Sequence, residues 1–143
     1  MKPEIDQILS LSANQLMGVL SPLLPSGYPQ GSAAILGIMM MLSAQEYERA
    51  AEIRASENAD MRALFADAAP TIAERELKAE LAKAAATSDI SLKISALDAE
   101  NFALRRVLIR LHVHAEERGM RELERRIWTL LKAAAERRLL RLA

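Results

Sequence analysis

The spacing of apolar residues between positions 90 and 115 is the feature that most constrains how this chain can fold. Seven apolar residues and one polar residue recur there in alternating steps of four and three: Ile90, Ile94, Leu97, Asn101, Leu104, Leu108, Leu111 and Ala115. This heptad spacing places their side chains along one face of an α-helix. No segment has the alternating, β-branched or aromatic pattern that is typical of a β-strand. The sequence therefore predicts an all-α fold.

Prolines, glycines and capping residues divide the chain into five predicted helices. The first runs from Pro3 to about residue 20, and residues 21–31 form a loop rich in Pro and Gly. A long second helix covers residues 32–68 and ends before Pro70. The other three cover residues 71–87, 88–118 and 120–142, and Gly119 joins the last two in an antiparallel hairpin. We expect a bundle of four to five helices that forms a single all-α domain over residues 1–143.

Two helix starts carry specific capping signals. Thr71 and Glu74 have the spacing of a capping box, in which each side chain accepts a hydrogen bond from a free backbone N–H near the other. Ser88 and Asp89 precede the heptad pattern, and both are good N-cap residues. The sequence predicts that these caps begin the third and fourth helices.

Polar residues interrupt the apolar rows of the second helix. Arg54 falls within both rows that can face inward, and a buried guanidinium must be paired. Glu57, three residues on, is the partner that the spacing favours. The alternative is a core pocket for a small apolar or anionic ligand, bordered by Tyr47, Arg54, Asn58 and Asn101.

Asn101 is the one polar member of the heptad pattern. A buried Asn in such a seam costs stability but fixes the register and the number of partner helices. It could instead line the ligand pocket. We favour the register role because a single polar residue in a seam is the better-attested case.

Two features favour self-association. A row of small residues at intervals of four lets a second helix approach closely, and it consists of Ala51, Ala55, Ala59 and Ala63. The last predicted helix has two adjoining apolar rows, one of which contains Trp128, the only tryptophan. This face is wider than one neighbouring helix covers. We therefore expect a homodimer, with these alanines and Trp128 as candidate interface residues.

Several kinds of chemistry have no support in the sequence. Cysteine is absent, which excludes disulfides and thiolate chemistry. His112 and His114 are two residues apart and point in different directions on a helix, so we expect no metal site. No phosphate loop, dinucleotide fingerprint or nucleophile elbow is present, and we expect no cofactor. An enzyme is therefore the function class with the least support.

Charge is uneven along a chain that is neutral overall. Residues 1–100 carry a net charge of −6 and residues 101–143 a net charge of +6, and the basic half includes a stripe of Arg106, Arg110, His114 and Arg118. The stripe could bind a phosphate backbone, but it could equally pair with acidic helices. We favour the pairing.

These observations favour a non-catalytic interaction or assembly protein. The two alternatives are a core binder of a small ligand and an electrostatic nucleic-acid binder that uses the basic C-terminal helices. The longest apolar run, Ala33 to Leu42, is too short to cross a membrane. We therefore expect no membrane partner and a cytoplasmic location.

Overall fold

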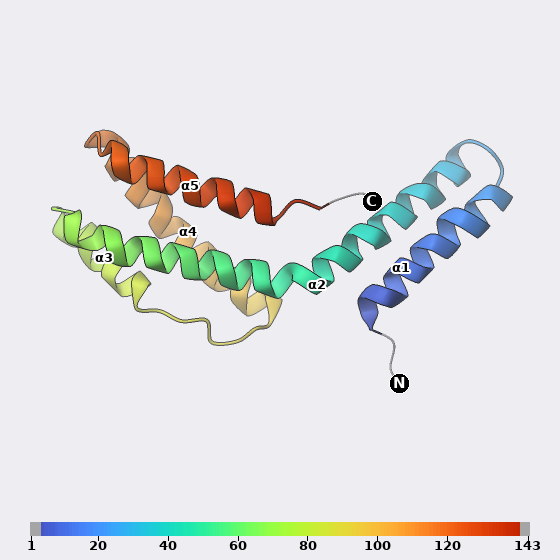
Figure 1. Cartoon of the computed structure of the whole chain (residues 1–143), viewed down its shortest axis with the longest axis horizontal. Coiled ribbons are helices and arrows are strands. Elements are labelled where there is room, and N and C mark those ends of the chain that lie inside the picture. The colour runs from blue at the N-terminus through green and yellow to red at the C-terminus, as the bar shows by residue number, and fades with distance from the viewer. Residues whose placement is uncertain (1–3, 141–143) are drawn as a thin grey trace. The chain divides into compact units, whose positions relative to one another are not determined.

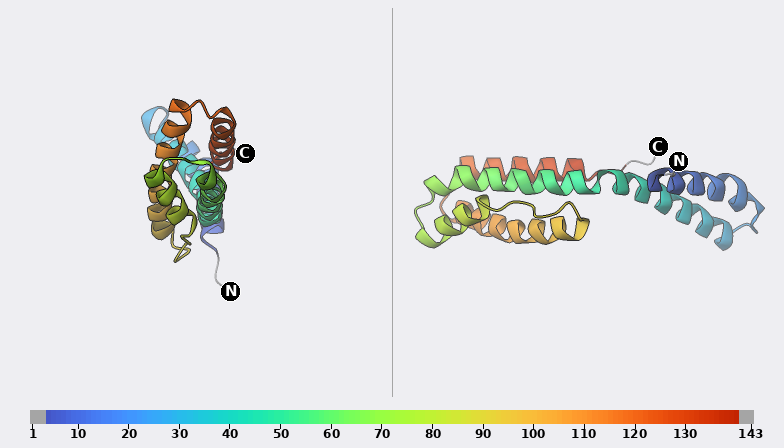
Figure 2. Two further views of the ribbon diagram at one scale, coloured as in Figure 1. Left: turned by 90° about the vertical axis from the view of Figure 1, so that its left-hand side faces the viewer. Right: turned by 90° about the horizontal axis from the view of Figure 1, so that it is seen from below.

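The structure is a computed structural model that describes residues 4–140, and it confirms the all-α prediction (Figures 1 and 2). The helices are α1 (Ile5–Gln15), α2 (Tyr28–Ala68), α3 (Arg75–Ala85), α4 (Ile94–Glu117) and α5 (Arg121–Arg137). A π-helical turn over Leu16–Leu20 and a 3-10 turn over Ser21–Leu23 follow α1, and a second 3-10 turn over Ala69–Thr71 follows α2. Residues 4–140 contain no strand. The long second helix, α2, and the predicted C-terminal helix pair, α4 and α5, are both present.

Some predicted boundaries are wrong by several residues. The loop predicted over 21–31 shrinks to about residues 24–27, because α2 already begins at Tyr28. Pro29 fits this first turn, where a backbone donor is not needed. Near the C-terminus, α5 ends at Arg137 rather than at residue 142. Pro3 and Leu142, the predicted ends of the first and last helices, lie outside the described residues.

Both predicted caps are wrong as well. Thr71 lies in a 3-10 turn and its hydroxyl donates to the Ala68 carbonyl at 2.8 Å, so it does not cap α3. α4 begins at Ile94, five residues after Asp89. Asp89 instead accepts hydrogen bonds from Asn58 and Arg62 of α2. The Asp89 carboxylate therefore bonds to residues distant in the sequence and does not cap α4.

Contacts within the chain divide it into two compact units, and each is described by itself. The bundle unit comprises Ala51–Arg138. The described part of the hairpin unit comprises residues 4–50 with Leu139 and Leu140. α2 supplies residues to both units. The single domain predicted over residues 1–143 stays a prediction.

The bundle unit has a conventional apolar core. The last turns of α2 pack against α3, α4 and α5, and Gly119 turns the chain between α4 and α5 with a φ of +61°. The largest fully buried side chains there include Phe65, Met61, Leu81, Leu111 and Ile127. Six members of the predicted heptad row, from Leu97 to Ala115, are buried, whereas Ile90 and Ile94 are exposed. The heptad row thus faces the core from Leu97 to Ala115.

The hairpin unit has a different construction. α1 folds back along the first part of α2 (Figures 1 and 2). Gly27, with a φ of +96°, lies in the connection and adopts a backbone conformation that other residues rarely tolerate. Every buried residue among positions 4–50 is a serine or smaller: Ala13, Ser21, Ala33, Gly37, Ala44 and Ala50. The unit therefore buries none of its large apolar side chains completely.

The two phenylalanines of the chain allow a matched test of the bundle core. Phe65 is fully buried and Phe102 is 67% exposed. Phe65→Ala is expected to lower the free energy of unfolding by about 3–5 kcal/mol, because it leaves a cavity in the core. Phe102→Ala is expected to change it by less than about 0.5 kcal/mol. Urea denaturation measures both, and equal losses would contradict the assigned core.

Candidate functional site

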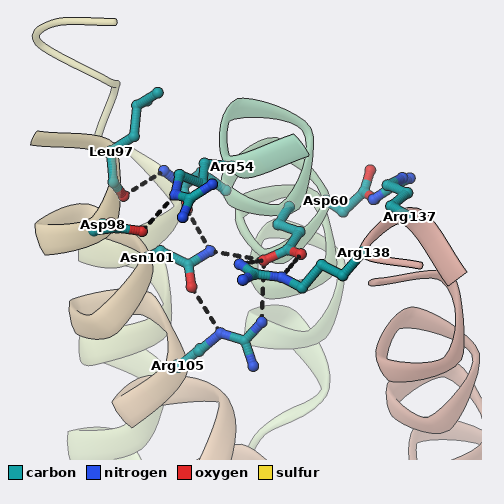
Figure 3. Close-up of polar contacts among 10 residues, drawn as sticks. Arg54, Asp60, Leu97, Asp98, Asn101, Arg105, Arg137 and Arg138 are labelled. Atoms are coloured by element: carbon teal, nitrogen blue, oxygen red, sulfur yellow. Dashed lines mark hydrogen bonds and ion pairs between the residues drawn. The ribbon is translucent and has the colours of Figure 1, made fainter. Parts of the chain in front are cut away.

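A buried carboxylate lies at the centre of the bundle unit. Glu57 of α2 is 2% exposed, and its Oε2 accepts hydrogen bonds from Asn101 Nδ2 at 3.1 Å and Arg105 at 3.0 Å. Arg138, just after α5, donates through Nε to Oε1 at 2.6 Å and through a terminal nitrogen to Oε2 at 2.8 Å (Figure 3). Glu57 thereby connects α2, α4 and the end of α5. We call Glu57, Asn58, Asn101, Arg105 and Arg138 the polar cluster.

The two asparagines of the polar cluster use their hydrogen-bonding groups within the chain. Asn101 donates to Glu57 and to Asn58 Oδ1 at 2.9 Å, and its own oxygen accepts from Arg105 at 2.7 Å. Asn58 is fully buried and donates to Asp89 and to the Leu97 carbonyl. An amide offers two N–H donors and one carbonyl oxygen, so each of these amides is satisfied. Their pairing sets the register of α4 against α2.

Charge pairs surround the polar cluster. Arg54 Nε donates to Asp98 Oδ1 of α4 at 2.6 Å. Glu57, the partner that the sequence favoured for Arg54, accepts the hydrogen bonds of Asn101, Arg105 and Arg138 described above. Local spacing within α2 missed Asp98 because it lies 44 residues away in the sequence. Arg54 is therefore paired across two helices, as Figure 3 shows.

The pKa values of two carboxyls follow from this arrangement. Burial acts to raise the pKa of Glu57, but the hydrogen bonds from Arg138 and Arg105 outweigh it and hold that pKa below its usual range. The hydrogen bond from Arg62 is the main cause that lowers the pKa of Asp89. Both groups stay ionised at neutral pH. The polar cluster therefore contains one fixed negative charge, on Glu57, which the guanidinium groups of Arg105 and Arg138 face.

The structure brings together only some of the predicted ligand-pocket residues. Arg54, Asn58 and Asn101 lie in the bundle unit. There Asn101 donates to Asn58, Asn58 donates to Asp89, and Arg54 donates to Asp98. Tyr47 belongs to the hairpin unit and is 51% exposed. No buried donor of Asn58 or Asn101 is left over for a ligand. The arrangement supports a structural role for these residues more than a binding role.

The predicted interface residues lie at varied depths in the bundle unit. Ala51 and Ala55 are half-buried, whereas Ala59 and Ala63 are exposed. Trp128 is exposed on α5 and meets the ring of His112 edge-on, with 5.3 Å between the ring centroids. Trp128 is therefore not a core residue. Its contact with a second chain stays a prediction.

The basic stripe of α4 is partly neutralised by α3. Arg110 pairs with Glu76 at 3.4 Å and with Glu80, and the buried His114 lies 3.3 Å from Glu74. An acidic partner would have to compete with these carboxylates. The stripe therefore offers less free positive charge than the sequence pattern indicates.

The outer surface of the hairpin unit is a functional candidate that the sequence reasoning missed. The exposed large apolar side chains among residues 4–50 come from α1, α2 and the connection between them: Ile5, Ile8, Leu11, Val19, Leu20, Leu23, Leu24, Tyr28, Ile35, Leu36, Met39 and Tyr47. We call this set the hairpin surface. A signal was available, because no charged residue occurs between Gln7 and Gln45, a stretch of 39 residues. Surface helices normally carry charges on one face.

Close packing inside the hairpin explains why these side chains point outward. A Cβ atom on Gly37 of α2 would overlap Cγ of Met17, which lies in the turn after α1. Small residues at Ala13, Ala33 and Gly37 let the two segments approach without space for a larger side chain. None of the large apolar side chains is therefore completely buried: some are partly buried, namely Leu9, Leu16, Met17, Ile38, Met40, Met41 and Leu42, and those of the hairpin surface are exposed.

Residues 4–140 contain neither a metal site nor a membrane span. No three His, Asp or Glu side chains in this range are placed to hold a metal ion. In the same range, no helix has both the length and the hydropathy needed to span a bilayer. No known protein family matches the chain, and neither the curated proteins nor the solved structures contain a match to it.

Substitution of Glu57 tests the polar cluster. Glu57→Gln is expected to lower the free energy of unfolding at pH 7 by about 1.5–3 kcal/mol, because the hydrogen bonds from Arg105 and Arg138 lose their charged acceptor, while the two half-exposed guanidinium groups remain hydrated. Glu52→Gln, at an exposed position on the same helix, is the matched control and is expected to cost less than about 0.5 kcal/mol. Urea denaturation gives both values.

The pH dependence provides a second readout. A lowered pKa in the folded state stabilises the protein above the unfolded pKa, about 4.3 for Glu, and this stabilisation is lost as the pH falls through the folded pKa. The difference between the wild type and Glu57→Gln should therefore shrink as the pH is lowered from 5 towards 3. A difference that stays constant over this range would contradict the pairing of Glu57.

Proposed function

We propose that this protein is a non-catalytic assembly protein whose hairpin surface binds a protein partner. The observation that carries the proposal is that residues 4–50 bury only small residues completely and leave the twelve large apolar side chains of the hairpin surface exposed. Exposed apolar patches beyond a few hundred Å² are rare on monomeric proteins and mark interaction sites. We further propose that it acts in the cytoplasm, since the chain lacks cysteine.

The bundle unit supports this function as a stable anchor. It has its own apolar core, and its buried charges have partners within the chain. We expect such a unit to fold around its own core, which leaves the apolar residues of the hairpin surface available to a partner. In this proposal the bundle unit supplies the stable core and the hairpin unit supplies the binding surface.

The other two candidate functions have weaker support. A core ligand would have to displace hydrogen bonds that already satisfy Asn58 and Asn101. A nucleic acid would have to compete with Glu74, Glu76 and Glu80 for the basic stripe. Apart from Tyr47, which the predicted ligand pocket includes, neither candidate uses the hairpin surface.

Site-specific photocrosslinking in the protein's own cells tests the proposal. A photoreactive residue in place of Leu36, on the hairpin surface, is expected to give adducts whose protein component mass spectrometry identifies. The same residue in place of Lys132, an exposed position on α5, is the control and is expected to give few or none. Equal yields at the two positions, or no adducts at Leu36, would refute an assembly function for this surface.

A further inference from the structure

The chemistry of the hairpin surface restricts what can cover it. Its side chains are aliphatic or aromatic, and the polar residues among positions 7–45 are uncharged Ser, Asn, Gln and Tyr. A partner must therefore match an apolar surface without supplying charges of its own, because a charge buried there would have no counter-charge. This requirement favours another surface of the same composition.

A second copy of the chain meets this requirement. In a twofold dimer the same patch meets itself, so a patch that carries like charges would repel its copy. Between Gln7 and Gln45 there is no charge to repel. The part of the hairpin surface from Ile8 to Met39 is therefore complementary to itself in both polarity and charge, whereas its end members Ile5 and Tyr47 lie beside acidic residues.

The sign of the flanking charges disfavours an anionic partner. Glu4, Asp6, Glu46 and Glu48 border the stretch, against the two bases Lys2 and Arg49. Helices that lie on membrane surfaces place Lys and Arg around their apolar face, where they attract anionic lipids. Acidic flanks would be repelled by anionic lipid and by nucleic acid alike. They cost a protein dimer little, because at the rim they remain in water.

The helical geometry supports the same occupant. Two helices alone cannot shelter the large residues on their outer faces, and here only small residues are completely buried, although Met17 packs against Gly37. A second hairpin laid on this unit would cover exposed residues such as Leu11 and Leu36. A four-helix bundle is the ordinary arrangement in which antiparallel helix pairs bury apolar faces.

We propose that a second copy of this chain covers the hairpin surface, so that α1 and the first part of α2 from two copies form an intermolecular four-helix bundle. This inference rests on the proposed assembly function and names the partner. It places the dimer contact in the hairpin unit rather than at the alanine row and Trp128 that the sequence singled out.

Sedimentation equilibrium of the full chain between 0.1 and 100 µM, a range of about three decades, tests the inference. The wild type is expected to form a dimer. The double variant Leu11→Glu/Leu36→Glu is expected to raise the dissociation constant at least about hundredfold, because each charge would be buried without a partner. Leu92→Glu, which adds a charge at an exposed apolar position of the bundle unit, is the matched control and should leave the dimer intact.

Circular dichroism and urea denaturation of the double variant show whether its bundle unit remains folded. Both substitutions lie outside that unit and at exposed positions, so its cooperative transition is expected to be retained. If the double variant loses this transition, the milder variant Leu11→Ser/Leu36→Ser replaces it in the sedimentation experiment. That variant is also expected to raise the dissociation constant of the dimer.

Two results would overturn the inference: a wild-type monomer throughout the range, or a dimer that the double variant leaves unchanged. If the wild-type monomer floats with phosphatidylcholine or phosphatidylglycerol vesicles, lipid is the occupant instead. A monomer whose Leu36 position crosslinks to a different identified protein would refute self-association but leave the assembly function standing.

Discussion

The buried carboxylate of Glu57 is the constraint on which the bundle unit depends. A carboxylate at 2% exposure is unfavourable unless its charge and its lone pairs are all matched. Here three elements must be in place at once, since Asn101 and Arg105 come from α4 and Arg138 follows α5. A helix that slipped by one turn would leave the charge unpaired. The apolar core supplies most of the favourable burial, and Glu57 restricts that core to one alignment.

The same logic extends outward from the polar cluster. Asn58 links the cluster to Asp89, which lies in the segment between α3 and α4 and also accepts from Arg62. That segment has no regular structure of its own, so the carboxylate of Asp89 fixes its path. The position of α4 is therefore set at two places, at Asn101 within the helix and at Asp89 ahead of it.

Periodicity predicted the fold class because it depends only on residues close together in the sequence. The heptad row identified α4 and its buried face, and Gly119 marked the turn before α5. The predicted caps failed for two different reasons. Asp89 has partners distant in the sequence, Asn58 and Arg62, whereas the Thr71 hydroxyl donates locally to the Ala68 carbonyl. In and beside the polar cluster, the sequence singled out Arg54, Glu57, Asn58 and Asn101 but could not name Asp98 or Arg138 as partners, since those contacts span 44 and 81 residues.

The charge-free stretch of the hairpin unit has a consequence for synthesis. Ribosomes make the chain from its N-terminal side at about 5–20 residues per second. Residues 4–50 therefore leave the ribosome on the order of ten seconds before the last residue of the bundle unit is added. During that interval the nascent chain presents a run of 39 uncharged residues with no acidic or basic gatekeepers inside it. The segment with the least protection against aggregation is therefore exposed before the bundle unit can fold.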